Sequence, residues 1–255
     1  MLIAITREVS PTISQCELTH LARQPIDVRL AQMQHHQYEA ALTVCGCQVI
    51  RLPAEPTLPD AVFVEDTAIV LDEVAIITRP GADARKAEIV SIASALAPYR
   101  RLHFIEAPGV VDGGDVLRIG KRLYVGLSSR SNGAAIEQMM AVLRPFGYSV
   151  YSVQVNGCLH LKSAVTQVSP TLLLVNPTWM DAGGFGDMQV VEVDADEPNA
   201  ANALWLGDRV IYPTDYPRTQ QRLRQHGIAV HGVDVGELIK AEGAVTCCSL
   251  IFNCE

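Results

Sequence analysis

The sequence has no segment rich in lysine or arginine, and its formal net charge at pH 7 is −8. A surface with this charge does not attract the phosphates of nucleic acid or of anionic lipid. The sequence also lacks an apolar run of about 18 residues that would span a membrane, and its first residues lack the pattern of a signal peptide. We expect a cytoplasmic protein whose partner is a small molecule, and the oligomeric state stays open, with a homodimer among the options.

Metal-binding spacings such as Cys-x-x-Cys and His-Glu-x-x-His are absent as well, so no metal cofactor is expected. The seven cysteines are an odd number, in a chain of 255 residues that is 49% hydrophobic and can bury a core without disulfides. We expect thiols throughout. The adjacent Cys247 and Cys248 could form a disulfide only with strained geometry.

Four similar segments recur along the chain, each with β-favouring residues, a polar turn and further β-favouring residues. They start at Asp66, Asp115, Ala164 and Asn202. Their starts are separated by roughly 40 to 50 residues, a period in the range that is typical of repeat folds. The sequence therefore predicts four β-hairpins in a repeating arrangement.

Helical patterns, in which apolar residues return at three and four positions, are found over 27–46, 82–97, 132–147 and 217–227. The strand-like segments 2–6 and 244–252 have no local hairpin partner. Pairing them would complete a fifth unit and close a ring. We expect an α/β propeller-like fold in one domain over 1–255; a mixed α/β sandwich with accidental spacing is the alternative.

Three carboxylates interrupt an apolar run in "LPDAVFVEDTAIVL", namely Asp60, Glu65 and Asp66. Buried, unpaired carboxylates are costly, so these groups should face solvent, a protein cation or a bound cation. A guanidinium is one such cation. The alternative is a solvated strand end at the entrance of the first hairpin.

The string "VDGGDVL" places Asp112 and Asp115 around two glycines, which permit close backbone approach. Arg85 and Arg130 each follow a hairpin. Two such arginines either form surface ion pairs that add little to stability or bind a carboxylate through paired hydrogen bonds. Acids at one end of a site and arginines at the other would suit an amino acid with a cationic side chain.

His160 lies between two leucines, just before the third hairpin. A lone histidine among apolar residues is most often a core residue. If a thiol lies near the same ring centre, however, a Cys/His pair becomes reasonable, and an acid such as Asp112 could orient the imidazole.

Together these strings resemble the dimethylarginine dimethylaminohydrolase family, within the guanidine-modifying superfamily of arginine deiminases and amidinotransferases. The matching strings are "LPDAVFVED", "ITRPGADAR", "DGGDVL", "YVGLSSRSN", "LHLKS", "AAN" and "TCCS", in family order over nearly the whole chain. The resemblance implies a five-module α/β propeller, or pentein, with pseudo-fivefold ββαβ-type repeats around a central channel.

The resemblance also implies a role for each matching residue. Cys247 would be the nucleophile, His160 the general acid and base, and Asp112 the acid that orients the histidine. The implied substrate contacts are Glu65 and Asp66 for the guanidinium, Asp60 and the Leu18 backbone for the amino group, Arg85 and Arg130 for the carboxylate, and the Ala241 carbonyl. Cys248 would face away, because neighbouring side chains of a strand point to opposite faces.

The implied reaction is a cofactor-independent hydrolysis of Nω-methylated arginines to citrulline and dimethylamine or methylamine, through a covalent thiouronium intermediate on Cys247. Zinc at Cys247 and His160 would be an inhibitor. Residues 12–25 would supply Leu18 and a lid over the channel. The alternatives are an arginine deiminase-like or other guanidine hydrolase, and an amino-acid-binding protein without turnover.

Overall fold

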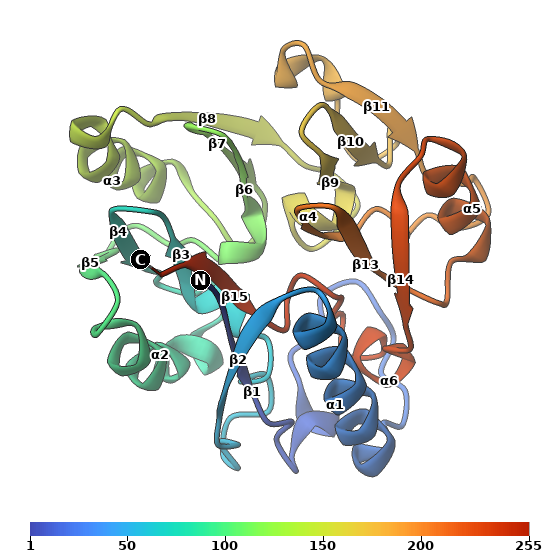
Figure 1. Ribbon diagram of the computed structural model, residues 1–255. Helices are drawn as coiled ribbons and strands as arrows, with labels where there is room; N and C mark the ends of the chain where they lie inside the picture. Colours follow the sequence, from blue (N-terminus) through green and yellow to red (C-terminus); the bar gives the residue numbers. More distant parts are fainter. Residues whose placement is uncertain (255) are drawn as a thin grey trace.

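The computed structural model describes residues 1–254, and its strands form five separate three-stranded sheets arranged around a common centre (Figure 1). In chain order the sheets consist of β3 (Ala68–Val70), β4 (Val74–Ile77) and β5 (Arg101–Phe104); β6 (Val116–Ile119), β7 (Arg122–Leu127) and β8 (Ser149–Gln154); β9 (Val165–Ser169), β10 (Leu172–Val175) and β11 (Gln189–Glu192); β12 (Leu204–Leu206), β13 (Arg209–Pro213) and β14 (Ala229–Val233); and β15 (Leu250–Asn253), β1 (Leu2–Arg7) and β2 (Cys47–Leu52).

Each sheet repeats one pattern: an antiparallel pair of strands, which is a hairpin in four sheets and β15 with β1 in the fifth, is followed by a third strand that is parallel to its neighbour. A helix connects the hairpin to the third strand in four of the five units, because a parallel connection needs a crossover. These helices are α1 (Val28–Val44), α2 (Ile89–Leu96), α3 (Gly133–Leu143) and α5 (Pro217–Gln225). In the unit of β9 to β11 the connection contains only the 3₁₀ turn Ala182–Phe185.

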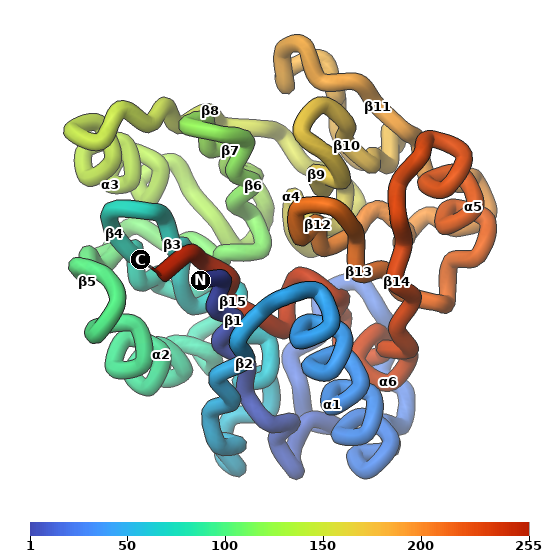
Figure 2. The backbone as a smooth tube through the Cα atoms, in the orientation of Figure 1, coloured from blue at the N-terminus to red at the C-terminus, as the bar shows by residue number. Residues whose placement is uncertain are grey.

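The two ends of the described chain lie side by side and close the ring (Figure 2). β1 pairs antiparallel with β15, with Leu2 opposite Asn253, and parallel with β2. This confirms the predicted fifth unit. β15 begins only at Leu250, however, so the prediction of a strand over 244–252 was wrong for residues 244–249.

Cys247 and Cys248 lie in the turn before β15 and not in a strand. The turn forms because the Asn202 amide binds both the backbone and the hydroxyl of Thr246, and because the Cys247 N–H donates to the Ala244 carbonyl. The strand argument that directed the two thiols to opposite faces therefore does not apply.

The helix expected over 82–97 is also shorter than predicted, since α helix covers only Ile89–Leu96 and a 3₁₀ helix covers Asp83–Glu88. In the 3₁₀ segment the Arg85 side chain is turned inward, where its guanidinium binds Asp66 and Glu88. This buried ion cluster dictates the local backbone more strongly than helix periodicity does.

Five apolar clusters fill the spaces between neighbouring sheets and their outer helices, and together they form the core. The α1 helix covers one such cluster with Tyr38 and Leu42, both fully buried. Asp27 caps this helix by accepting hydrogen bonds from the N–H groups of Arg29 and Leu30. Within residues 1–254, no helix is long and apolar enough to cross a membrane.

Short helical turns precede the hairpins at the centre of the ring and carry the polar side chains of the sequence motifs. They are η2 (Val64–Thr67) before β3, η4 (Gly113–Asp115) before β6 and α4 (Leu161–Ala164) before β9. The remaining short helices are η1 (Ile13–Gln15), η5 (Arg144–Phe146) and α6 (Gly236–Ile239). Because the units repeat, equivalent turns from different units converge on one central region.

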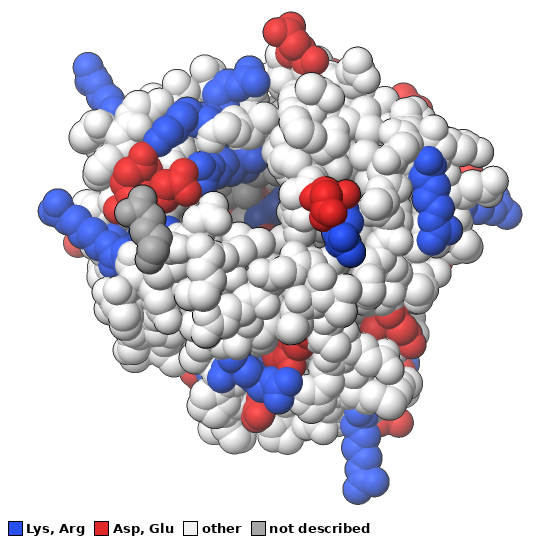
Figure 3. Space-filling model, in the orientation of Figure 1, with Lys and Arg blue, Asp and Glu red and all other residues white. Residues whose placement is uncertain are grey.

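On the face shown in Figure 3 the molecule is hollowed near this centre. A cavity there is lined by residues of β3, β6, β12 and β15 and by Glu65, Lys162 and Thr246. The second central cavity, described next, holds most of the predicted site residues.

Candidate active site

Most of the predicted site residues line one pocket of about 310 Å³. Its lining residues are Glu17, Asp60, Phe63, Asp66, Arg85, Arg130, Leu159, His160, Ala241, Glu242, Gly243 and Cys247. They come from segments that precede or follow different hairpins and from the N-terminal segment before α1. The ring closure therefore brings residues far apart in the sequence to one place.

His160 lies between two carboxylates. Its Nε2 is 3.1 Å from Asp112 Oδ2, and its Nδ1 is 3.9 Å from Asp66 Oδ1. Burial alone would lower the pKa of His160, but Asp66, Asp112 and Asp115 outweigh burial and raise that pKa to about 9. The imidazole is therefore protonated at neutral pH.

The position of His160 is fixed by the two neighbouring segments. The buried Asp115 carboxylate accepts the Leu161 N–H at 2.9 Å and the hydroxyls of Ser128 and Ser131. Gly114 packs directly against the imidazole, since a Cβ at this position would lie 2.5 Å from His160 Nδ1. The second glycine of "DGGD" is therefore required by close approach.

Asp66 is held in place by Arg85 and by the backbone of Gly114. Its Oδ2 is 2.6 Å from Arg85 Nη1, and its Oδ1 accepts the Gly114 N–H at 2.9 Å. Burial would raise the pKa of Asp66, but the charges of His160 and Arg85 outweigh burial and lower that pKa to about 2. The pocket thus contains a fixed negative charge beside the imidazolium.

Cys247 is buried at the pocket wall. Its carbonyl accepts the Glu65 N–H, which ties the turn to η2. Burial, together with the negative charges of Glu65 and Asp66, raises the pKa of the Cys247 thiol well above its usual value. Cys248 is fully buried, points its sulfur towards the Ala244 carbonyl and does not line the pocket. Only the first of the two thiols borders the pocket.

Residues at the other end of the pocket contact the N-terminal segment. Asp60 Oδ2 accepts the Glu17 N–H at 3.0 Å, and Arg130 Nη2 donates to Thr19 Oγ1 at 2.9 Å. Leu18 lies between these two anchored residues, and its side chain packs against the core cluster beside α1. Burial raises the pKa of Asp60, although the charge of Arg85 opposes this.

Three of the predicted residues, Leu18, Glu65 and Asp112, do not line this pocket. The Glu65 carboxylate binds Lys162 Nζ at 2.5 Å and Thr246 Oγ1 at 2.8 Å, and it lines the other central cavity. The structure does not bring it into the pocket. Arg85 lines the pocket, but its guanidinium is already bound to Asp66, Glu88 and two backbone carbonyls.

No family model matches the chain. It is 36% identical to an N(G),N(G)-dimethylarginine dimethylaminohydrolase from Pseudomonas aeruginosa, over 89% of this chain and 90% of that one. It is 35% identical to the protein of the same name from Streptomyces coelicolor, over 97% and 95% of the two chains. The chain belongs to the dimethylarginine dimethylaminohydrolase family.

Solved structures of dimethylarginine dimethylaminohydrolases share this fold. A cysteine-to-serine variant from Pseudomonas aeruginosa, complexed with citrulline, superimposes with a TM-score of 0.92 at 34% identity, covering 98% of each chain. A histidine-to-glycine variant, as an adduct with S-methyl-L-thiocitrulline, has the same TM-score. The N-terminal domain of ArgZ, covalently bound to a reaction intermediate, has a TM-score of 0.89 at 18% identity. At this identity the similarity shows a shared fold and nothing more.

The pocket region also contains a group of possible metal ligands. Within residues 1–254, Asp66, Asp112 and His160 offer ligand atoms that all lie within 4.8 Å of one another. Cys247 is not part of this group. Because the pKa of His160 is raised to about 9, a metal ion would have to displace its proton. Inhibitory zinc at Cys247 and His160 stays a prediction.

Sequence reasoning missed five residues in and around this pocket. Asp115 stood in a quoted motif without a role, and Lys162 follows His160 by two positions. Glu88 lies one turn after Arg85, a spacing that suggests an ion pair. Glu17 and Glu242 have no distinguishing pattern in the sequence, because their positions depend on how the N-terminal segment meets the turn after α6.

Proposed function

We propose that this protein hydrolyses Nω,Nω-dimethylarginine and Nω-monomethylarginine to citrulline and dimethylamine or methylamine, with Cys247 as the nucleophile. One observation carries the proposal: a single pocket is lined by a cysteine, a histidine with a raised pKa and an ionised aspartate. The names of the relatives support the substrate class, and their complexes contain citrulline and S-methyl-L-thiocitrulline.

The charges in the pocket suit a zwitterion with a cationic side chain. Asp66 would face the guanidinium, Arg130 would bind the carboxylate, and Asp60 with the Leu18 carbonyl would bind the amino group. The Ala241 carbonyl would accept a further hydrogen bond from the substrate. Arg85 contributes positive charge, but its bonds to Asp66 and Glu88 leave Arg130 with more donors for the substrate carboxylate.

The first chemical step is the attack of Cys247 Sγ on the guanidinium carbon. In the free protein this sulfur is a thiol, because burial and nearby carboxylates raise its pKa. A bound guanidinium adds a positive charge close to the sulfur and so favours release of the thiol proton to water, since His160 is already protonated. Binding of the cationic substrate is thus what forms the nucleophile.

His160 then acts as an acid and later as a base. Asp112 occupies Nε2, which leaves Nδ1 to protonate the departing amine while the carbon–nitrogen bond breaks. This leaves a thiouronium ester on Cys247 and a neutral imidazole. The imidazole takes a proton from water as the water attacks the same carbon, and cleavage of the carbon–sulfur bond releases citrulline and the thiol.

Several statements about the whole protein belong to the same proposal. Each step uses only side chains and water, so the reaction needs no cofactor. Residues 1–255 act as one catalytic unit, which the pairing of β1 with β15 supports. A cytoplasmic location suits a pocket that depends on a free thiol. A homodimer is tested by sedimentation of the purified protein.

The test is citrulline release from dimethylarginine, monomethylarginine and arginine, measured side by side for the wild type, Cys247→Ser and Cys248→Ser. We expect release from the methylated substrates, lost with Cys247→Ser and retained with Cys248→Ser. Preference for arginine would assign a deiminase with the same site. Binding of all three without release would assign an amino-acid-binding protein.

A further inference from the structure

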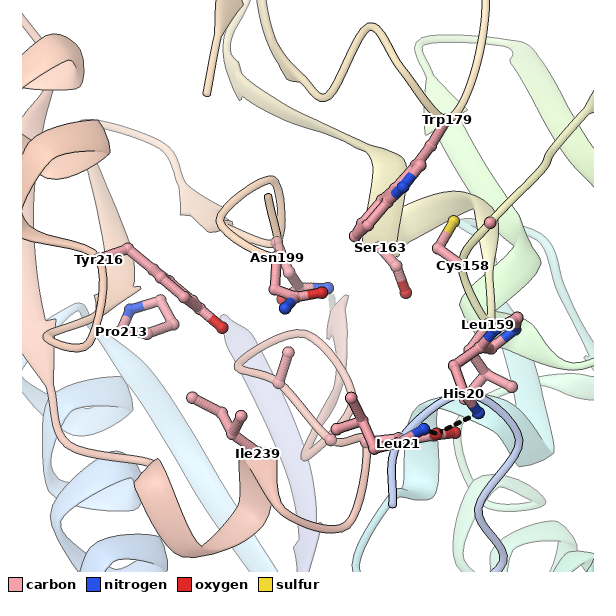
Figure 4. Close-up of a pocket in the computed structure, with 15 residues that line it drawn as sticks. His20, Leu21, Cys158, Leu159, Ser163, Trp179, Asn199, Pro213, Tyr216 and Ile239 are labelled. Atoms are coloured by element: carbon pink, nitrogen blue, oxygen red, sulfur yellow. Dashed lines mark hydrogen bonds between the residues drawn. The ribbon is translucent and has the colours of Figure 1, made fainter. Parts of the chain in front are cut away.

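The turn that follows α6 holds the N-terminal segment through one carboxylate. Glu242 accepts hydrogen bonds from three consecutive backbone N–H groups: Thr19 at 3.0 Å, His20 at 2.6 Å and Leu21 at 2.6 Å. Figure 4 shows the dashed bonds that reach His20 and Leu21. Residues 17–21, called the strap below, are thus fixed to the turn by charge-assisted hydrogen bonds.

The backbone of Glu242 has a conformation that favours glycine. Its φ is 57°, and within residues 1–254 it is the only residue other than glycine with a positive φ. Side chains are strained in this region, whereas glycine is not. The strained residue lies at the edge of a substrate pocket, which is where such strain is commonly linked to function. A glycine at position 242 would relieve the strain but would lack the carboxylate that binds the strap.

The turn itself is firmly anchored. The Glu242 N–H donates to the Ile239 carbonyl and the Gly243 N–H donates to the Leu238 carbonyl, both at 3.0 Å. Gly243 packs so closely on Phe63 that a Cβ would lie 2.1 Å from its ring. Because the turn cannot move easily, the carboxylate is a fixed point to which the strap is attached.

The other contacts of the strap are made with residues of the pocket. Asp60 binds the Glu17 N–H, and Arg130 binds the Thr19 hydroxyl. Leu18, whose carbonyl is the proposed contact for the substrate amino group, is the residue between these two. Its position therefore depends on the bonds that hold Thr19, two of which are made by Glu242.

Glu242 also separates two cavities. It lines the substrate pocket together with Glu17, and it lines a neighbouring pocket together with His20, Leu21 and Trp179 (Figure 4). Release of the strap from Glu242 would therefore open the wall between the substrate pocket and this second pocket.

We propose that Glu242 is a positioning residue that holds the strap over the substrate pocket and thereby retains the bound amino acid. The claim that the strap retains the bound amino acid rests on the proposed function, whereas the claim that Glu242 holds the strap does not. Glu242 touches the strap through its carboxylate and acts on the substrate through Leu18 and Glu17.

Hydrogen–deuterium exchange of the free protein tests the attachment without any substrate. The variants are Glu242→Gln, which weakens the acceptor, and Glu242→Gly, which removes the carboxylate and also the backbone strain. We expect the amides of Thr19, His20 and Leu21 to exchange about tenfold faster or more in Glu242→Gly, and less so in Glu242→Gln. Because the glycine variant relieves strain, its melting temperature should stay at or above that of the wild type.

Glu197→Gln is the matched control. Its carboxylate also accepts two backbone N–H groups, but they come from Arg218 and Thr219 at the start of α5 and not from the strap. Exchange at residues 19–21 should not change in this variant. If exchange at residues 19–21 is unchanged in Glu242→Gly, or is accelerated equally in Glu197→Gln, then Glu242 does not hold the strap.

Steady-state kinetics with dimethylarginine test the retention. We expect KM to rise about tenfold in Glu242→Gly, with a much smaller change in kcat, since the catalytic groups remain in place. An unchanged KM together with faster exchange would overturn the retention. If the wild type releases no citrulline at all, the proposed function fails, while the exchange experiment still decides whether Glu242 holds the strap.

Discussion

His160 and Asp112 form a buried pair in which Nε2 of the imidazole lies 3.1 Å from Oδ2 of the carboxylate. Asp112 is itself fixed, because its other oxygen accepts the Gly81 N–H at 2.8 Å and the side chain is fully buried. The imidazole is thus oriented by a group that cannot rotate freely. Several predictions about catalysis depend on this arrangement.

Replacement of Asp112 by asparagine should keep the shape of the pair but remove its charge. The pKa of His160 should then fall from about 9 towards its usual value, and kcat should decrease by about 10²-fold because the neutral amide stabilises the protonated imidazole less. The measurement is the pH profile of kcat/KM, whose alkaline limb should move to lower pH. Asp72→Asn, which removes an exposed partner of Arg118, is the control. An alkaline limb that stays in place would exclude this role of Asp112.

Stability should depend on pH through His160. Its pKa is raised from 6.5 to about 9 in the folded state, so protonation stabilises the fold fully below pH 6.5, and this contribution is lost as pH rises towards 9. The contribution is on the order of 3 kcal/mol for a shift of this size. Urea unfolding at pH 6.5 and pH 9 should show a larger decrease for the wild type than for His160→Asn. Equal decreases would contradict the raised pKa.

The thiol of Cys247 should react slowly with neutral electrophiles. Because its pKa is raised by burial and by Glu65 and Asp66, little thiolate exists at pH 7.5 in the free protein. The measured quantity is the rate with a cationic haloacetamidine divided by the rate with iodoacetamide. We expect this ratio to be at least about tenfold larger for Cys247 than for glutathione. The rates are measured by mass spectrometry in a Cys248→Ser background. The same ratio as for glutathione would show that the pocket does not select cations.

Gly114→Ala should damage the site without damaging the fold. The added Cβ would lie 2.5 Å from His160 Nδ1 and 2.8 Å from Asp66 Oδ1, so at least one of them must move. A displacement of about 1 Å is enough to lower kcat by about 10²-fold. Gly133→Ala, where a Cβ meets open space, should have normal kinetics. Normal turnover in Gly114→Ala would show that the imidazole position is not critical.

The repeating architecture could be predicted from the sequence because each unit carries its own local signal. The hairpins that start near Asp66, Asp115, Ala164 and Asn202 were found from alternating β-favouring residues and polar turns, and the closure of the ring followed from two strands without partners. All of these hairpins are present. Local patterns thus determine the elements, and repetition determines their arrangement.

The site was less accessible to sequence reasoning because its details depend on contacts between units. Glu65 and Asp66 are adjacent in the sequence, yet Glu65 binds Lys162 and lines one central cavity, whereas Asp66 lines the other. Likewise, nothing near Glu242 in the sequence shows that the strap lies against it. Such choices are made by packing between distant segments.

The most direct test of the account is to trap the covalent intermediate. The Cys248→Ser variant would be mixed with Nω,Nω-dimethylarginine, quenched in acid during turnover and digested for mass spectrometry. The account predicts a thiouronium adduct on Cys247, formed with loss of dimethylamine and absent after the additional change Cys247→Ser. Citrulline formation without any adduct on Cys247, or with an adduct on another cysteine, would contradict it.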